Sequence, residues 1–361
     1  GGPLMEGQGT FYGLGQDLAG DLGLPGGLGL LISALVGIAV VMGAVTVLAM
    51  YLIWQERKVA AHIQVRLGPM RVGGWHGWAQ SIADGVKLLM KEDLRPGGAP
   101  PVLFYMAPAL VLGAALATFV ALPLSSRLYI ADVNLGVFYI FGIGALSVIG
   151  VIMAGWASNN KWSVLGAIRE AAQVVSYEIP LGLSLLVPVL MHGTLSLKDA
   201  ADAQAGWAGM QWAVFTNPFA AVALVLFFVA ALANAGRAPF DLPESESELV
   251  AGFHTEFSGI RFSFFFLAEY AHMFVVSAVG VALFLGGWHL PGLSLLDGTA
   301  HDVASAVVFI VKSWILVTLM MVIRWTLPRV RIDQVMSMGY RYLTPIGLFC
   351  VLGAAWWELY L

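Results

Sequence analysis

The chain has 361 residues, of which 59% are hydrophobic and only 11% are charged, whereas about a quarter of the residues are charged in an ordinary soluble domain. This composition, with a mean hydropathy of +0.83, excludes a soluble globular protein and favours one that crosses a bilayer several times. The formal net charge of -4 and the lack of a dense Lys and Arg cluster exclude nucleic acid as a partner, because neutralising phosphates requires many clustered cations.

Eight apolar stretches are long enough to cross a membrane, since a helical span needs about 20 apolar residues. They are continuous runs rather than alternating segments, which excludes a β-barrel. The predicted spans are 28–54, 101–123, 133–157, 166–191, 213–235, 261–287, 303–327 and 341–361. We therefore predict an all-α integral membrane protein, with residues 1–361 forming a single membrane domain.

The first long loop, residues 55–100, contains a predicted amphipathic helix. Its apolar positions recur at helical spacing at Trp78, Ile82, Val86 and Leu89. Asp84, Lys87 and Lys91 lie elsewhere around the same helix, so one face is polar and the other apolar. We predict that this helix lies at the membrane interface. The pattern alone does not decide whether it only rests at the headgroups or also lines a site.

The fourth span contains acidic side chains where lipid disfavours them, since a carboxylate at the bilayer centre costs at least about 2.5 kcal/mol. Glu170 and Glu178 are eight residues apart and therefore lie on nearly the same helix face. Pro180 cannot donate a hydrogen bond to the carbonyl of Ser176. Water can satisfy the carbonyl that is left, so we predict a hydrated notch beside Glu178.

The loop between the fifth and sixth spans, residues 236–260, is acidic. Carboxyl groups crowded at low dielectric cannot all stay ionised, which suits proton exchange, although a solvated acidic loop explains the same pattern. The sixth span adds Glu269 with His272 one turn later, and the seventh contains Lys312. Glu269 and His272 can instead form a structural hydrogen bond, and Lys312 can pair with a neighbouring carboxylate to hold two helices together.

Lys and Arg are distributed unequally between the two sides of the predicted membrane. About 14 of them follow spans one, three, five and seven, and about two follow the others. The positive-inside rule therefore places the two long loops in the cytoplasm and both termini outside. The start of the chain, GGPLMEG, has no basic region before an apolar one, so we predict no cleavable signal peptide.

Metal chemistry is limited by composition. The single cysteine, Cys350, excludes an internal disulfide and a thiolate cluster site. Five histidines lie near the expected interfaces without the spacing of metal ligands: His62, His76, His192, His289 and His301. We therefore predict no metal site and no redox centre in this chain.

Four long motifs occur in the chain in a characteristic order. They are WQERKVAAHIQVRLGPMRVG (54–73), DGVKLLMKED (84–93), GWASNNKWSVLGAIREAAQVVSYEIPLGLSLL (155–186) and RAPFDLPESESELVAGFHTEFSGIRFSFFFLAEY (237–270). Together with the eight predicted spans, they closely resemble a membrane component of respiratory complex I, the proton-pumping NADH:quinone oxidoreductase. The component in question is the H subunit of the bacterial enzyme, which corresponds to subunit 1 in mitochondria.

The resemblance implies a role and a set of partners. Members of this family anchor the hydrophilic arm of the enzyme and form much of the chamber through which quinone enters from the bilayer. They bind no prosthetic group themselves. Quinone is the substrate, and flavin and iron-sulfur clusters are held by partner subunits, while small membrane subunits lead on to antiporter-like ones. The implied location is the bacterial plasma membrane rather than the mitochondrial inner membrane.

The resemblance also implies two groups of site residues. The expected quinone-chamber residues are Glu56, Arg57, Arg66, Asp84, Arg237 and Phe266. The expected proton path, which links the chamber to the antiporter-like subunits, consists of Glu178, Asp241, Glu244, Glu246, Glu248, Glu256 and Glu269. An apolar quinone tail requires apolar walls, and a reduced headgroup requires nearby cations and exchangeable protons.

The chain departs from the family pattern at two positions. Met70 replaces the Asn of the usual GPN sequence, which changes the hydrogen bonding available to that loop. Asn234 stands three residues before the Arg of the RxPFD motif, where many members have Glu, so one protonatable link is absent. Glu170 or water can substitute for it.

Two other functions fit the sequence. The first is the related membrane anchor of an energy-converting hydrogenase or a ferredoxin-linked complex, which shares the fold, although the intact GPxRVG and PFDLPExExEL motifs favour the respiratory enzyme. The second is a stand-alone ion transporter that uses Glu178 and Lys312. The chain has no inverted repeat to support it.

Overall fold

The computed structural model describes residues 26–206, 211–243, 246–293 and 298–360. All regular elements in these ranges are helices, as predicted. The long ones are α2 (Gly26–Ile63), α4 (Pro101–Thr118), α5 (Gly136–Ala157), α6 (Lys161–His192), α10 (Pro218–Asn234), α12 (Gly259–Phe284), α13 (Gly298–Thr326) and α15 (Thr344–Tyr360). Two shorter elements, α14 (Ile332–Ser337) and the π-helical η6 (Met338–Leu343), lead directly into α15.

Seven helices in the described ranges are long and apolar enough to span a membrane, which confirms a multi-pass membrane protein but not the predicted count of eight. The exception is the predicted span 213–235. It is divided into α9 (Ala213–Thr216) and α10, because Asn217 caps α10 and Pro218 occupies its first turn. The remaining 17 residues of α10 cover about 26 Å, slightly less than the hydrocarbon core of about 30 Å.

The first span is longer than predicted. Helix α2 continues nine residues beyond Trp54, to Ile63. Polarity ends an apolar run without ending a helix, and the segment QERKVAAHI contains mostly good helix formers. Glu56 and Arg57 therefore extend from a rigid helix and not from the loop expected after the span.

Helix α6 begins where the side chain of Asn160 accepts a hydrogen bond from the backbone N–H of Trp162, and it ends at Gly193 in the left-handed conformation. The carbonyl of Ser176, where we predicted a hydrated notch, lies against the π-helix η6. A Cβ atom added at Gly339 would come within 3.0 Å of that carbonyl oxygen. The close contact between α6 and η6 therefore depends on Gly339, which has no side chain.

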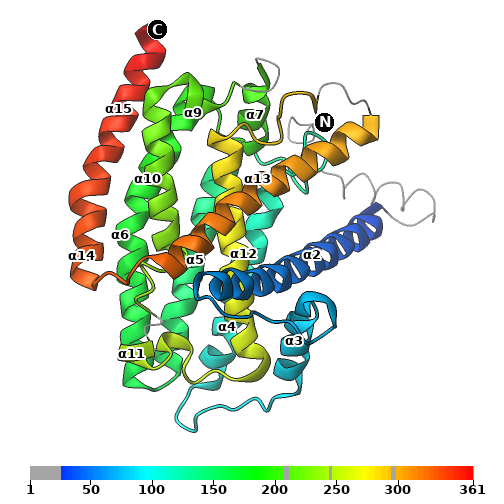
Figure 1. Cartoon of the computed structure of the whole chain (residues 1–361), viewed down its shortest axis with the longest axis vertical. Coiled ribbons are helices and arrows are strands. Elements are labelled where there is room, and N and C mark those ends of the chain that lie inside the picture. Colours follow the sequence, from blue (N-terminus) through cyan, green and yellow to red (C-terminus); the bar gives the residue numbers. More distant parts are fainter. Residues whose placement is uncertain (1–25, 207–210, 244–245, 294–297, 361) are drawn as a thin grey trace.

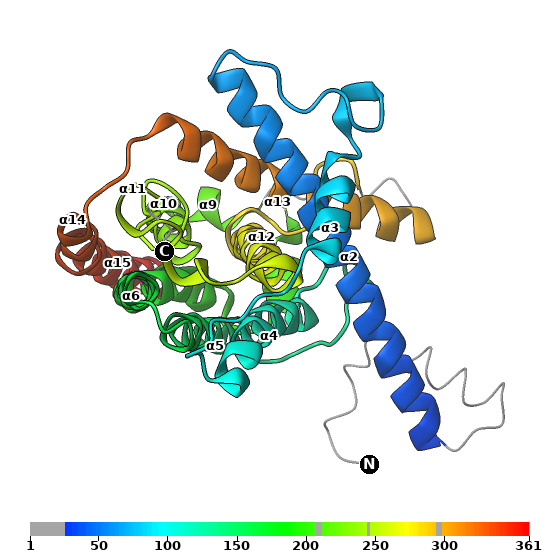
Figure 2. The same cartoon turned by 90° about the horizontal axis from the view of Figure 1, so that it is seen from below.

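Helix α12 lies at the centre of the bundle and contacts α4, α13, α2 and α10 (Figure 2). Most of it is buried, including the whole stretch Met273–Phe284. Helices α6, α10 and α15 run roughly parallel to it, whereas α2 and α13 cross the bundle obliquely (Figure 1). The oblique helices bring Glu56 and Arg324 to the middle of α12 from outside the parallel group.

Small residues allow the central helices to approach closely. Ala220, Ala223, Ala230 and Ala231 of α10 are fully buried, which is typical of helix contacts in membranes. Near the start of α6, a Cβ atom added at Gly166 would lie 2.9 Å from the Cα atom of Gly252. This contact holds the acidic loop 236–260 against α6.

The predicted amphipathic helix is present as α3 (Gln80–Met90), but it is shorter than predicted, because Trp78 precedes it and Lys91 follows its last residue. The hydroxyl group of Ser81, in the first turn of α3, donates a hydrogen bond to the backbone carbonyl of Met50 in α2 over 2.7 Å. Ile82, Val86 and Leu89 are exposed, as expected for an apolar face that contacts something other than this chain. The position of α3 at a membrane interface remains a prediction.

Candidate functional site

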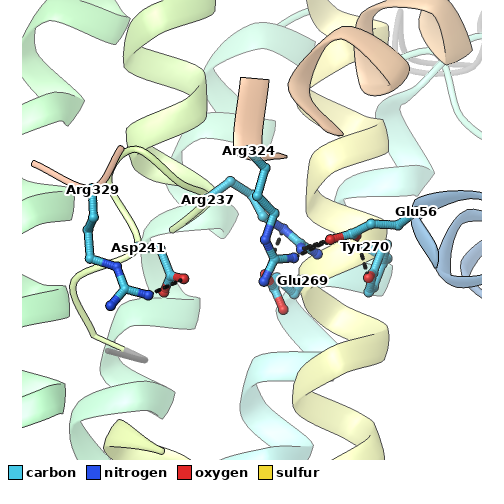
Figure 3. A network of polar contacts seen from close by, with 7 residues as sticks. All are labelled: Glu56, Arg237, Asp241, Glu269, Tyr270, Arg324 and Arg329. Atoms are coloured by element: carbon cyan, nitrogen blue, oxygen red, sulfur yellow. Dashed lines mark hydrogen bonds and ion pairs between the residues drawn. The ribbon is translucent and has the colours of Figure 1, made fainter. Parts of the chain in front are cut away.

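Five ionisable side chains from four elements meet in the interior of the bundle. We call this group the buried charge cluster. Its members are Glu56 from α2, Arg237 from the loop after α10, Glu269 and Tyr270 from α12, and Arg324 from α13 (Figure 3). These positions are 268 residues apart at the extremes, so the tertiary fold alone brings them together.

Glu56 accepts several hydrogen bonds within the buried charge cluster, and only 5% of the residue is exposed. Its carboxylate accepts hydrogen bonds from Nη1 of Arg237, over 3.2 and 3.3 Å. It also accepts one from the Tyr270 hydroxyl over 2.6 Å and one from Nη1 of Arg324. Charge-assisted bonds of this kind are stronger than neutral ones, so Glu56 is held in place from three directions.

Arg237 joins the two acids of the buried charge cluster. Its Nε atom lies 2.7 Å from Oε1 of Glu269, and its guanidinium carbon lies 4.5 Å from the centre of the Tyr270 ring. The residue is 3% exposed. With Glu56, Glu269 and Arg324 the formal charges sum to zero, which is how a bundle of this kind tolerates buried charge.

A separate ion pair lies beside the buried charge cluster and joins the acidic loop to the segment that follows α13 (Figure 3). Oδ2 of Asp241 lies 3.2 Å from Nη2 of Arg329, and Asp241 is 7% exposed. The neighbouring His254 is buried, and this burial lowers its pKa to about 4, although the negative charge of Asp241 opposes the shift. His254 is therefore neutral at pH 7. Its ring centre lies 5.8 Å from that of Phe266.

A cavity of about 90 Å³ is lined by residues of α4, α5, α6, α10 and α12. Its polar lining consists of Glu170, Asn234, Glu269 and His272 together with smaller groups. Glu170 approaches the backbone at Gly236, where an added Cβ atom would lie 3.7 Å from its Oε1 atom. The first cavity thus contains Glu269, which also belongs to the buried charge cluster.

A second cavity of about 40 Å³ contains Glu178. Its other walls are mainly apolar, such as Phe141 and Phe227. The two cavities share Gly144, Asn234 and His272 as lining residues. Nδ2 of Asn234 donates a hydrogen bond to Nε2 of His272 over 3.3 Å. The alternative of a hydrogen bond between Glu269 and His272 is not supported, since His272 contacts Asn234 and Glu269 forms an ion pair with Arg237.

The expected quinone-chamber residues do not all come together. Glu56 and Arg237 are in direct contact, whereas Arg57 pairs with Asp84 of α3 over 2.5 Å at the edge of the bundle. Phe266 packs near His254. Arg66 is exposed, and its Nε atom donates to the side chain of Gln64 over 2.7 Å, so its described contact is local.

The acids of the expected proton path also separate into groups. Glu248 forms an ion pair with Arg169 over 2.5 Å. Glu256 accepts a hydrogen bond from Nδ2 of Asn160 over 2.7 Å. Both therefore hold the acidic loop to the start of α6. Glu244 lies outside the described residues, and so does the side chain of Glu246.

Lys312 contacts backbone carbonyls, and not the carboxylate that was one of the two alternatives for it. Its Nζ atom donates hydrogen bonds to the carbonyls of Leu285, Gly287 and His289, over 2.7 to 3.1 Å. It also lies 4.2 Å from the ring centre of Trp212. Lys312 thus caps the carbonyl end of α12, and these contacts give no support to an ion site shared with Glu178.

Sequence reasoning missed Arg324 as a site residue. Arg324 lies near the end of the predicted span 303–327, and α13 brings it beside Glu56. Its position within an apolar run is the available signal, because ionisable residues at membrane depth usually face a protein interior. The roles of Tyr270 and Asn234 depend on tertiary contacts that spacing does not reveal.

A third cavity, of about 720 Å³, is almost entirely apolar. It lies along α2 between Val40 and Tyr51, and its other lining residues include Phe119 and Phe274. It shares no lining residue with the two cavities that contain the acids.

Comparisons with known proteins agree on one family. The family model described as NADH dehydrogenase matches residues 36–355. The chain is 47% identical to the H subunit of NADH-quinone oxidoreductase from Anaeromyxobacter dehalogenans over 321 residues, which cover 85% of this chain and 77% of that protein. It is 43% identical to the protein of the same name from Chlorobium luteolum, with 94% of this chain and 91% of that protein covered.

Proposed function

The chain belongs to the NADH dehydrogenase family, and from this premise we propose that it is the quinone-chamber subunit of a proton-pumping NADH:quinone oxidoreductase. In this role it anchors the hydrophilic arm, admits quinone from the bilayer and couples quinone reduction to proton movement. The relatives reported above are named as the H subunit of NADH-quinone oxidoreductase, and this favours the respiratory enzyme over the hydrogenase-type anchor.

The observation that carries the proposal is the buried charge cluster. Reduction of a quinone adds two electrons and two protons, so negative charge develops on its headgroup before protonation. Arg237 and Arg324 are cations held in fixed positions, and Glu56 and Glu269 neutralise them in the resting state. A developing negative charge nearby would compete with these carboxylates for the same guanidinium groups. The charge of the headgroup would thereby alter the ion pairing of Glu269.

The two cavities provide a route along which a change in the ion pairing of Glu269 can affect Glu178. Glu269 belongs to the buried charge cluster and also lines the first cavity. Glu178 lines the second cavity, which meets the first at Asn234 and His272. A change in the ion pairing of Glu269 alters the electrostatic field along this series of groups. Protons are then taken up or released at Glu178, which lines the cavity that contains no member of the buried charge cluster.

The remaining components belong to other subunits in this proposal. NADH is oxidised at a flavin, and electrons reach quinone through iron-sulfur clusters held by partner chains. The hydrophilic arm docks on the side of the membrane where the loop 55–100 exposes basic and apolar residues, among them Arg66 and Trp75. The chain lies in a bacterial plasma membrane with both termini outside.

The test is a Glu178→Gln variant of the whole enzyme. Because a neutral amide cannot carry a proton, we expect lower quinone reductase activity and proton pumping, while NADH oxidation by ferricyanide remains unchanged. Glu358→Gln serves as the matched control, since Glu358 is an exposed carboxylate on α15 that lines neither acid-containing cavity. Wild-type turnover and proton stoichiometry in the Glu178→Gln enzyme would remove this role.

A further inference from the structure

We propose that His272, assisted by Asn234, is the proton-transfer residue that joins the two acid-containing cavities. The proposal rests on the function proposed above and identifies one further residue within it. The proposal concerns the junction between the cavities, which we define by the residues that line both of them. Neither Glu178 nor any member of the buried charge cluster is among these residues.

The lining of the cavities leads to this assignment. The three shared lining residues are Gly144, Asn234 and His272. Glycine has no side chain and an amide does not titrate, so His272 is the one titratable side chain among the described residues that lines both cavities. Glu170 and Glu269 are confined to the first cavity and Glu178 to the second. A proton that passes between the acids therefore meets His272 at the junction.

Other polar side chains near the junction are committed elsewhere. Tyr177, which precedes Glu178, donates its hydroxyl to the carbonyl of Val335 over 3.1 Å. The amide nitrogen of Gln173 donates to the carbonyl of Ala233 over 2.7 Å. Neither side chain lines either cavity. Lys312 is bound to the carbonyls at the far end of α12.

The chemistry of the pair fits proton transfer. Nδ2 of Asn234 donates to Nε2 of His272, so in this arrangement Nε2 is the acceptor and the ring proton resides on Nδ1. If Nε2 gains a proton, rotation of the Asn234 amide presents its carbonyl oxygen to the new N–H group. The amide can therefore hydrogen-bond to the ring in both states, and Asn234 acts as a positioning residue for either form.

The transfer step conserves protons. His272 accepts a proton at one ring nitrogen from an acid or water in one cavity, and it releases the proton of the other ring nitrogen into the other cavity. Rotation of the ring then restores the starting arrangement. The ring gains one proton and loses one in each cycle, and no electron transfer or additional reactant is required.

The experiment compares three variants of the whole enzyme in sealed vesicles. His272→Asn leaves two amides at the junction, which can hydrogen-bond but cannot carry a proton. We expect about a tenfold loss or more in quinone reduction and proton pumping. The exchange variant, Asn234→His with His272→Asn, keeps one imidazole and one amide between the same cavities, and we expect it to recover most of the lost rate. His192→Asn, at the far end of α6, is the control and should retain the wild-type rate.

Oxidation of NADH by ferricyanide reports how much enzyme has assembled in each preparation. Wild-type rates and stoichiometry in His272→Asn would overturn the proposal, and so would an assembled exchange variant that is as slow as His272→Asn. If the exchange variant does not assemble, His272→Glu replaces it and must recover activity, since Glu also titrates. Impairment by Glu178→Gln but not by His272→Asn would refute the junction alone, whereas normal activity in both would refute the proposed function.

Discussion

The buried charge cluster and the second cavity both contain a carboxylate inside the bundle, but their surroundings differ. Glu56 is held by Arg237, Arg324 and Tyr270. Glu178 lies against largely apolar walls, and the structure gives it no hydrogen bond or ion pair within the described residues. A carboxylate that accepts hydrogen bonds from three strong donors is held in position and stays ionised, whereas one with few partners can change its protonation state. This difference is the reason why we propose charge positioning for the first region and proton exchange for the second.

Loss of a carboxylate from the buried charge cluster should produce the largest effect on stability. In Glu56→Gln the guanidinium groups of Arg237 and Arg324 lose their shared counter-charge in a buried site. Breaking a buried ion pair in this way costs about 3 to 5 kcal/mol. We expect a marked fall in the amount of assembled enzyme and in its thermal midpoint. Glu178→Gln should leave both nearly unchanged, and similar losses in the two variants would break the comparison.

Lowering the pH should destabilise the region beside the buried charge cluster, because His254 becomes protonated. Its pKa is about 4 in the fold, against 6.5 for an ordinary histidine. The unfolded chain therefore binds a proton that the folded chain does not between these values, and stability falls as the pH falls from 6.5 to 4. At pH 5 the loss is about 2 kcal/mol.

The variant His254→Phe removes this loss, and its ring suits a site already lined by Phe253, Phe262 and Phe266. We expect the thermal midpoint of the purified enzyme to depend less on pH between 6.5 and 4 in this variant than in the wild type. Identical pH profiles would show that His254 does not titrate as its burial implies.

A substitution in the turn before Arg237 should have a smaller effect on stability. Gly236 has a φ of 62°, in the left-handed region, and Gly236→Ala should therefore cost about 1 to 2 kcal/mol. The added Cβ atom has ordinary contact distances to Glu170, so the cost is due to the backbone and not to a clash. The measurement is the thermal midpoint, with Gly113→Ala in the middle of α4 as the control, because that site is open. Equal midpoints for the two variants would contradict the prediction.

The smallest effect is expected at the edge of the bundle. Arg57 pairs with Asp84, but its side chain is 44% exposed. Exposed ion pairs contribute about 0 to 1 kcal/mol. Arg57→Gln should therefore change the thermal midpoint by much less than Glu56→Gln, although the two residues are adjacent on α2. A large loss in Arg57→Gln would show that the edge pair is buried by a partner subunit.

The sequence predicts the helical class and most of the spans because continuous apolar runs are strong signals. The ends of the helices are less predictable. Hydropathy ends the first span at Trp54, but helix propensity continues it to Ile63. In the opposite direction, hydropathy joins residues that Asn217 and Pro218 separate into α9 and α10. Local capping and propensity decide both cases, and a hydropathy window averages over them.

The acids at membrane depth can be identified from sequence, but their partners cannot. Glu269 is recognisable as a charge within an apolar run, yet its contact with Arg237 depends on how the loop after α10 folds back. Arg324 and Glu56 are far apart in the chain and meet only because α2 and α13 both cross α12. The sequence marks Asn234 only as a missing protonatable link, whereas the structure places it beside His272 between the two cavities.

Redox-induced infrared difference spectroscopy of the whole enzyme tests the central claim most directly, because it records changes in carboxyl protonation while quinone is reduced. We predict a protonated-carboxyl band in the wild-type spectrum that changes on addition of NADH and is absent from the Glu178→Gln spectrum. The band should persist in Glu358→Gln. Identical difference spectra for the wild-type and Glu178→Gln enzymes would contradict the account.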